Sequence, residues 1–287
     1  MKTSWSSKWF DAGNTVFLIL LAVITLYPFW DSLVISIIPL EEYINASIHW
    51  RPHTIDLEAY AYLLEMPLLW TSYGNAIFVT VVGTAINMLI TIMTAYALSK
   101  QHLRGRGLFM ILIIFTMMFS GGIIPNYIIV KNLGMLNSLW SLIIPSAINT
   151  FNMIVLMNFF FTVPESLEES AKIDGCNDLG ILFRIVIPLS MPAIATITLF
   201  YAVGRWNEYF NAVLYITEAK KWTLQVFLRA MLFENQAAAQ SGGDSPSLLG
   251  EPIKMATVMI STIPVLLIYP FFQKHFVKGV TLGGVKE

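Results

Sequence analysis

Long apolar blocks separated by short polar segments dominate the chain. Each block is apolar for about 20 residues or more, which is the length that a helix needs to cross a bilayer. The blocks cover residues 12–38, 66–99, 107–130, 132–164, 185–216 and 255–273. Four of them, 66–99, 107–130, 132–164 and 255–273, contain no charged residue. This pattern predicts an all-α, polytopic membrane protein with six transmembrane helices.

Composition agrees with a location in the cell membrane. The chain has 287 residues, of which 56% are hydrophobic and 12% are charged, against about 25% charged in soluble proteins. Mean hydropathy is +0.67. A formal net charge of -1 gives no reason to expect a nucleic-acid partner. The first apolar block follows Lys2 and Lys8, as in a signal peptide, but it lacks a clear cleavage site, so we expect a retained anchor.

The distribution of lysine and arginine predicts the orientation, because basic residues gather in cytoplasmic loops. With a cytoplasmic amino terminus, the segments predicted to be inside hold Lys2, Lys8, Lys100, Arg104, Arg106, Lys172, Arg184, Lys274, Lys278 and Lys286. The outer segments hold Arg51, Lys131, Lys220, Lys221, Arg229 and Lys254. The inner segments are the more basic, so we expect both termini, and the polar stretch 162–188, to lie in the cytoplasm.

That polar stretch predicts a helix, a glycine turn and a second helix. Thr162 and Glu165 have the spacing of a capping box, and Gly175 can supply the left-handed residue that ends the first helix. Asn177 or Asp178 can cap a second helix, which we expect to stop before Pro188. In the first helix Leu167 and Ala171 share one face, and the small Ala171 would let a partner surface approach closely.

The same stretch resembles the EAA loop of ATP-binding-cassette (ABC) importer permeases, the MetI-like family. The matching residues are Glu169, Ala171, Asp174, Gly175, Ile185 and Pro188, with Ser170 and Cys176 as small departures. Ala95–Ser99, Trp206–Phe210 and the ending Pro270–Lys286 resemble segments of the carbohydrate-uptake permeases, and within that class the LplC/YtcP-type oligosaccharide permeases. The resemblance covers the chain from about residue 68 to its end.

This resemblance implies a type I ABC importer permease that moves a carbohydrate, most simply an oligosaccharide. It implies a second homologous permease subunit, two ATP-binding subunits and an extracytoplasmic solute-binding protein as partners. ATP and magnesium would be bound by the ATPase subunits, because this chain has no phosphate-binding loop of the Gly-rich Lys-Ser/Thr kind. The chain would therefore be no enzyme and bind no cofactor itself. The implied ATPase-coupling residues are Leu167, Glu169, Ala171, Asp174 and Gly175.

A second group of candidates lies in the fifth apolar block. Ionisable residues inside a membrane are costly and usually face a cavity or one another. Arg205 and Glu208 therefore either line a translocation pathway together with Asn207, or form an ion pair that holds the helices together. Trp206 and Tyr209 serve equally well as platforms for sugar rings or as anchors at the membrane interface. The residues alone leave both alternatives open.

The predicted organisation has two parts. Residues 1–66 hold the first transmembrane helix and an extracytoplasmic loop. Residues 67–287 form the core permease domain, with the coupling loop 162–188, an outer loop 217–254 and a cytoplasmic tail 274–287. In the outer loop the apolar residues of 224–232 follow helical spacing, for packing on the bundle or for docking a binding protein.

Two other classes of protein compete with the importer. An ion-gradient-driven secondary transporter or channel would need ionisable coupling residues, for which Arg205 and Glu208 are the only support. An intramembrane enzyme would need a nucleophile or metal cluster. The four histidines have no ligand spacing and there is one cysteine, so we expect no metal site.

Overall fold

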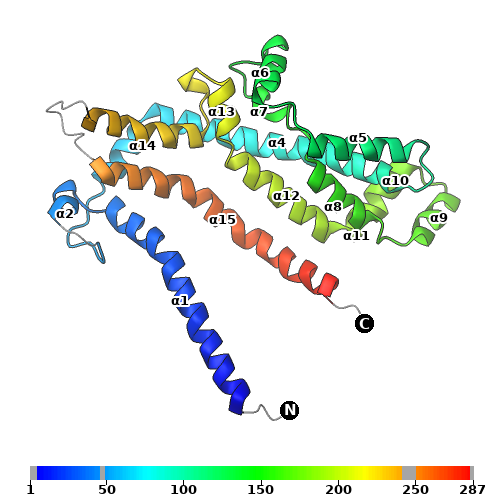
Figure 1. The fold of residues 1–287 in the computed structure, drawn as a ribbon, viewed down its shortest axis with the longest axis horizontal. Coiled ribbons are helices and arrows are strands. Elements are labelled where there is room, and N and C mark those ends of the chain that lie inside the picture. Colours follow the sequence, from blue (N-terminus) through cyan, green and yellow to red (C-terminus); the bar gives the residue numbers. More distant parts are fainter. Residues whose placement is uncertain (1–4, 46–48, 241–249, 285–287) are drawn as a thin grey trace. The chain divides into compact units, whose positions relative to one another are not determined.

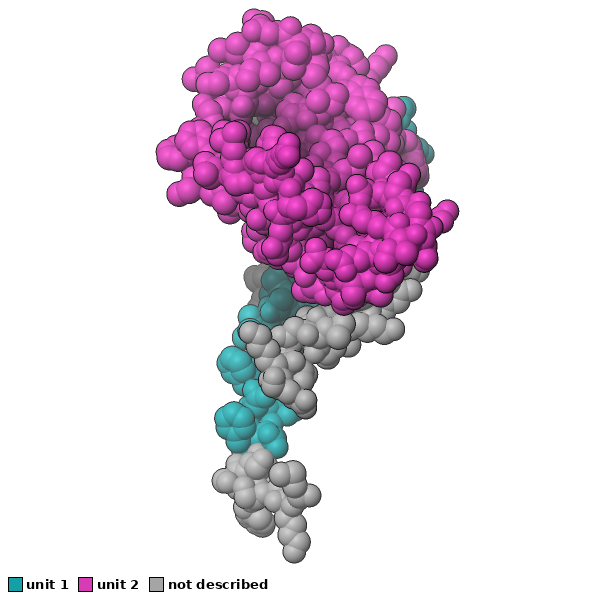
Figure 2. Space-filling view, turned by 90° about the vertical axis from the view of Figure 1, so that its right-hand side faces the viewer, with its two compact units in different colours: residues 1–67, 228–263 teal, residues 68–227, 264–287 magenta. Residues whose placement is uncertain are grey.

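The computed structural model describes the backbone of residues 5–45, 49–240 and 250–284, and the side chains of 9–45, 49–233 and 250–267. Every regular element within these ranges is a helix (Figure 1). This confirms the all-α prediction. The chain divides into two compact units, coloured separately in Figure 2: residues 1–67 with 228–263, and residues 68–227 with 264–287.

The first unit contains the amino-terminal helices. They are α1 (Trp5–Ser36), α2 (Leu40–Asn45) and α3 (Glu58–Glu65), joined by the second part of α14 (Leu224–Gln240) and the first part of α15 (Gly250–Gly284). In the loop before α3, the Glu42 carboxylate accepts hydrogen bonds from the backbone N–H groups of His53 at 2.8 Å and Thr54 at 3.0 Å. These bonds tie the loop back onto α2.

The second unit contains the remaining helices and both candidate sites. In chain order these are α4 (Pro67–Ser99), α5 (Arg106–Met118), α6 (Ile123–Asn132), α7 (Trp140–Ile143), α8 (Thr150–Phe160), α9 (Glu165–Ile173), α10 (Asp178–Ile181), a π-helix (Leu182–Val186), α11 (Ile187–Leu189), α12 (Met191–Trp206), α13 (Phe210–Tyr215), a short 3-10 turn (Ala219–Lys221), the start of α14 and the last part of α15. One buried cluster joins the ends of α4, α8 and α12 to α9, through residues such as Tyr96, Leu156 and Ile197. A second joins α4 to α6, α7 and α13.

Three helices are long and apolar enough to cross a membrane: Trp9–Ser36, Pro67–Ser99 and Gly250–Leu267. Two bent helix pairs bring the number to five if each pair is one span. These are Arg106–Met118 with Ile123–Asn132, bent by 112°, and Asp178–Leu189 with Met191–Trp206, bent by 87°. The fourth apolar block yields the four-residue α7 and the 11-residue α8, because the chain leaves the helix after Ile143, close to Pro145, and becomes helical again at Thr150.

Two details of the coupling loop 162–188 differ from the sequence prediction. The second helix does not stop before Pro188: the chain stays helical to Leu189, and the N–H of Ile187 donates to the carbonyl of Leu182 in a π-helical turn. The wider turn accommodates the proline, which would disrupt a regular α-helix. The predicted capping box is also wrong, because Thr162 Oγ1 donates to the Phe159 carbonyl and no side chain caps α9.

Candidate functional site

The coupling loop 162–188 consists of a helix, a glycine in the left-handed conformation and a second helix, as predicted. Gly175 has φ +81°, and the Cys176 N–H reaches back to the Ala171 carbonyl at 2.9 Å. This is the bond pattern that ends a helix at a glycine. Asn177 Oδ1 then accepts from the Gly180 N–H at 2.7 Å and so caps α10. The two caps fix the geometry of the turn.

Helix α9 has one face turned to solvent and one turned to its own chain. Glu165, Glu169 and Asp174 are exposed, Leu167 is 43% exposed and Ile173 is 88% exposed. Ala171, by contrast, is 8% exposed and belongs to the buried cluster of α4 and α8. The expectation that Ala171 faces a partner is therefore wrong. Its small side chain lets α9 pack closely against the helices of this chain.

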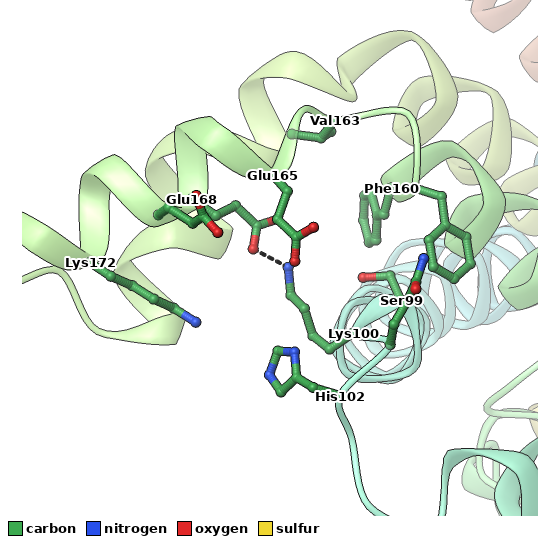
Figure 3. Close-up of a pocket in the computed structure, with 11 residues that line it drawn as sticks. Ser99, Lys100, His102, Phe160, Val163, Glu165, Glu168 and Lys172 are labelled. Atoms are coloured by element: carbon green, nitrogen blue, oxygen red, sulfur yellow. Dashed lines mark hydrogen bonds and ion pairs between the residues drawn. The ribbon is translucent and has the colours of Figure 1, made fainter.

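A buried ion pair anchors α9 to the end of α4. Glu168 is 9% exposed, and its carboxylate pairs with the ammonium of Lys100, the residue after α4 (Figure 3). The Lys100 Nζ also lies 4.2 Å from the centre of the Tyr96 ring, which adds a cation–π contact. The pair lies in the wall of a cavity of about 360 Å³ that also contains His102, Glu165 and Lys172 (Figure 3). Sequence analysis missed both Lys100 and Glu168.

Arg205 is the hub of a polar network inside the second unit. Its side chain is 6% exposed and donates to the carbonyls of Leu142, Ile143 and Ser146. It also donates to Ser146 Oγ at 2.9 Å and to Asn87 Oδ1 at 3.0 Å. The carbonyls of Leu142 and Ile143 end α7, and that of Ser146 lies in the irregular chain between α7 and α8, so no further helical turn satisfies them. Arg205 therefore supplies the hydrogen bonds that this break needs inside an apolar bundle.

The ion pair predicted between Arg205 and Glu208 exists but is loose. Their closest charged atoms, Arg205 Nη1 and Glu208 Oε2, are 4.0 Å apart, and Glu208 Oε1 accepts a hydrogen bond from Asn211 at 3.0 Å. The structural interpretation thus explains most of the contacts of Arg205. Both charged residues nevertheless line a cavity of about 210 Å³, so the pathway interpretation keeps its geometric basis.

The other pathway candidates lie in different surroundings. Trp206 is 6% exposed and its ring packs edge-on against Tyr73, with the ring centres 6.2 Å apart. It lines a larger cavity of about 760 Å³. Asn207 is exposed beyond the end of α12, and Tyr209 is half-buried in the cluster around α13. Neither Asn207 nor Tyr209 is among the described residues that line the two cavities.

The metal and outer-loop expectations have different outcomes. Among the residues that the structure describes, no three histidine, cysteine or acidic side chains are placed to hold a metal ion. Leu224 and Phe227 of α14 are fully buried, which supports packing on the bundle for the start of this helix. The side chains of the tail 274–287 lie outside the described residues.

Comparison with known proteins places the chain in one family. Residues 87–282 match the family described as binding-protein-dependent transport system inner membrane component. The chain is 49% identical to the polygalacturonan/rhamnogalacturonan transport system permease protein YtcP of Bacillus subtilis, over 98% of this chain and 99% of the relative. It is 45% identical to protein LplC of the same organism, over 100% of this chain and 98% of the relative.

A solved structure shows the same fold along almost the whole chain. The match is to a chain of a bacterial ABC transporter involved in the import of the acidic polysaccharide alginate. The TM-score is 0.87 and the identity is 38%, over 96% of this chain and 99% of that chain. The chain therefore belongs to the inner membrane components of binding-protein-dependent transport systems, as a multi-pass permease subunit of an ABC importer with the type I fold.

Proposed function

We propose that this permease translocates an oligosaccharide that contains uronate units. The main support for this proposal is that the chain is 49% identical, along nearly its whole length, to a permease named for polygalacturonan and rhamnogalacturonan. The solved relative at 38% identity is involved in the import of alginate, an acidic polysaccharide. Polygalacturonan and alginate both carry a carboxylate on their sugar rings. Acidic sugar oligomers are the chemistry that these two relatives share.

The complex proposed around the chain follows the type I importer plan. It contains a second homologous permease, two ATP-binding subunits that hold ATP and magnesium, and an extracytoplasmic solute-binding protein. Six membrane spans would place both termini in the cytoplasm, with the first span and an extracytoplasmic loop in residues 1–66 and the other five spans in the core domain 67–287. The basic residues on the predicted inner segments support this orientation.

Helix α9 is proposed as the element that docks on an ATPase subunit. Two apolar side chains, Leu167 and Ile173, are exposed on it beside the carboxylates of Glu165 and Glu169. Exposed apolar residues framed by charges are typical of a protein interface. In this role Leu167 and Glu169 would contact the ATPase. Ala171, Asp174 and Gly175 would hold the shape of the helix and turn.

The proposed mechanism involves no covalent chemistry in this chain. When the ATPase subunits close on ATP, they would move α9 as a rigid body. Glu168 and Ala171 hold α9 against α4 and α8, so this movement would be transmitted to the helix bundle. It would change the side of the membrane to which the translocation pathway opens. The binding protein would release its sugar into the outward-facing state, and hydrolysis would reset the transporter.

The proposed function is tested by sugar-stimulated ATPase activity of the reconstituted complex with its binding protein. The panel compares galacturonate oligomers with neutral oligomers of the same length, in wild type and Glu169→Lys. Acidic oligomers should stimulate wild type, and the charge reversal should abolish stimulation. Glu65→Lys is the matched control, since Glu65 is an exposed glutamate outside the coupling loop 162–188 and the outer loop 217–254. Uptake that continues without ATP and collapses with an ionophore would instead establish the secondary transporter.

A further inference from the structure

Helix α1 of the first unit changes its surroundings near its carboxyl end. Every residue from Trp9 to Trp30 is exposed, whereas Val34 and Ile35 are buried. Residues 12–30 carry no charge. A helix rises about 1.5 Å per residue, so the part between Trp9 and Trp30 is about 31 Å long, and the hydrocarbon core of a bilayer is about 30 Å thick. The exposed part of α1 therefore fits the lipid core, whose boundary falls at Trp30.

The described part of the loop before α3, residues 49–57, lies beside the same end of α1. The N–H of Asp56 donates to the carbonyl of Ile37, the residue after α1, at 2.8 Å. The indole N–H of Trp30, about two turns inside α1, donates to the carbonyl of Trp50 at 2.9 Å. These two bonds hold the loop along the last two turns of α1, with Trp50 at the level of Trp30.

Three aromatic rings gather at this level. The ring of Trp50 lies 5.9 Å from that of Tyr27, centre to centre, and Tyr27 precedes Trp30 by about one turn of α1. Tyr27 is 41% exposed, Trp30 is 49% exposed and Trp50 is 67% exposed. Tryptophan and tyrosine favour the lipid–water interface, because their rings are largely apolar and carry one polar group. The next residue, Arg51, is exposed, and a guanidinium binds phosphate well.

We propose that residues 49–57 are an interfacial anchor that binds the outer phospholipid surface through Tyr27, Trp30 and Trp50. The cluster continues the exposed, uncharged surface of α1 and lies at the level where that surface ends. A protein partner over the cluster would give no reason for the rings to gather at this level. The loop then lies on the membrane, and the buried end of α1 stands outside the hydrocarbon core. This inference goes beyond the proposed function, because it depends on neither the transported sugar nor the ATPase.

The test measures the depth of the loop in the complete transporter, reconstituted in lipid vesicles with cysteine-free partner subunits. A bimane fluorophore is attached to Trp50→Cys in a Cys176→Ser background, which removes the only cysteine of the chain. Lipids with a nitroxide on the headgroup should quench it more than lipids with a nitroxide in mid-chain. Ile24→Cys, 69% exposed within the apolar stretch, should show the reverse order. Glu58→Cys, exposed at the start of α3, should lose fluorescence mainly to aqueous iodide.

A second position keeps the test decisive where loss of the Trp50 ring itself releases the loop. Arg51→Cys leaves all three rings in place, and headgroup nitroxide should quench its fluorophore more strongly than that of Glu58→Cys. Quenching at Arg51→Cys by iodide alone would show that the loop lies in water. Resistance to iodide and to both nitroxide lipids would show that a protein surface covers it. Either result overturns the anchor.

Discussion

Arg205 illustrates how a charged side chain is held inside this bundle. Its guanidinium lies against α4, where a Cβ added to Gly83 would be 3.2 Å from Arg205 Nε and 3.3 Å from Cδ. Arg205 has little freedom to move away, because its N–H groups donate to five acceptor atoms. These are the carbonyl oxygens of Leu142, Ile143 and Ser146, Ser146 Oγ and Asn87 Oδ1. Gly83 is therefore the residue whose absent side chain makes room for the charge.

Gly83→Ala should destabilise the folded protein by about 1–3 kcal/mol, the usual cost of overpacking. The measurement is the free energy of unfolding in a detergent titration. Gly74→Ala is the matched control on the same helix, because a Cβ there meets nothing within 4 Å. That change should be neutral or stabilising by up to about 1 kcal/mol, since alanine favours helix over glycine. Equal effects of the two substitutions would show that Arg205 tolerates the added methyl group.

The stability of the first unit should depend on pH through the carboxyl group of Glu42. The backbone N–H of His53, and then that of Thr54, donate to its carboxylate and hold its pKa below the ordinary value. A carboxyl group with a lowered pKa stabilises the fold above its unfolded-state pKa and loses that contribution as the pH falls through the folded-state pKa. Amide exchange of His53 and Thr54 should therefore gain protection at neutral pH relative to acid pH. In Glu42→Gln the protection should be lower and independent of pH in this range.

At the scale of the helices and turns, features set by residues close in sequence could be predicted, and contacts between residues far apart in sequence could not. Gly175 and Asn177 shape the turn through contacts with residues at most five positions away, so their types and spacing predict it. The ion pair of Lys100 and Glu168 joins residues 68 positions apart, and a glutamate in a polar helix looks no different when it is buried. The prediction for Pro188 was wrong because a π-helical turn just before the proline lets the helix continue past it.

The pair of Lys100 and Glu168 should carry movement between α9 and α4. Glu168→Lys would set two cations together in a mostly buried site, so sugar-stimulated ATPase activity should fall strongly. Adding Lys100→Glu restores an ion pair with the charges exchanged and should recover part of that activity. A double-mutant cycle on stability should give a coupling energy of about 1–3 kcal/mol.

The control for this cycle lies in the same segment. Lys172 and Asp178 form an ion pair at 3.5 Å whose side chains are 46% and 74% exposed. Exposed pairs are screened by water, so the corresponding cycle should give less than about 1 kcal/mol. Two results would contradict a role of Lys100 in transmitting movement from α9 to α4. One is a coupling energy of the exposed pair as large as that of the buried pair. The other is a double variant, Glu168→Lys with Lys100→Glu, that recovers no sugar-stimulated ATPase activity.

For the whole molecule, the proposed orientation requires α9 and the segment after α13 to lie on opposite sides of the membrane. Ile173 on α9 is 88% exposed and the side chain of Lys221 before α14 is 41% exposed, so both positions are suited to cysteine labelling. In a Cys176→Ser background, an impermeant maleimide should reach Lys221→Cys in intact cells and Ile173→Cys only in inverted vesicles. This result follows from the basic inner segments and from the need of α9 for a cytoplasmic ATPase. Labelling of both cysteines from one side would require an even number of crossings between them and would remove the coupling role of α9. Epitope tags at the two termini, accessible only after permeabilisation, would complete the test of six spans with both ends in the cytoplasm.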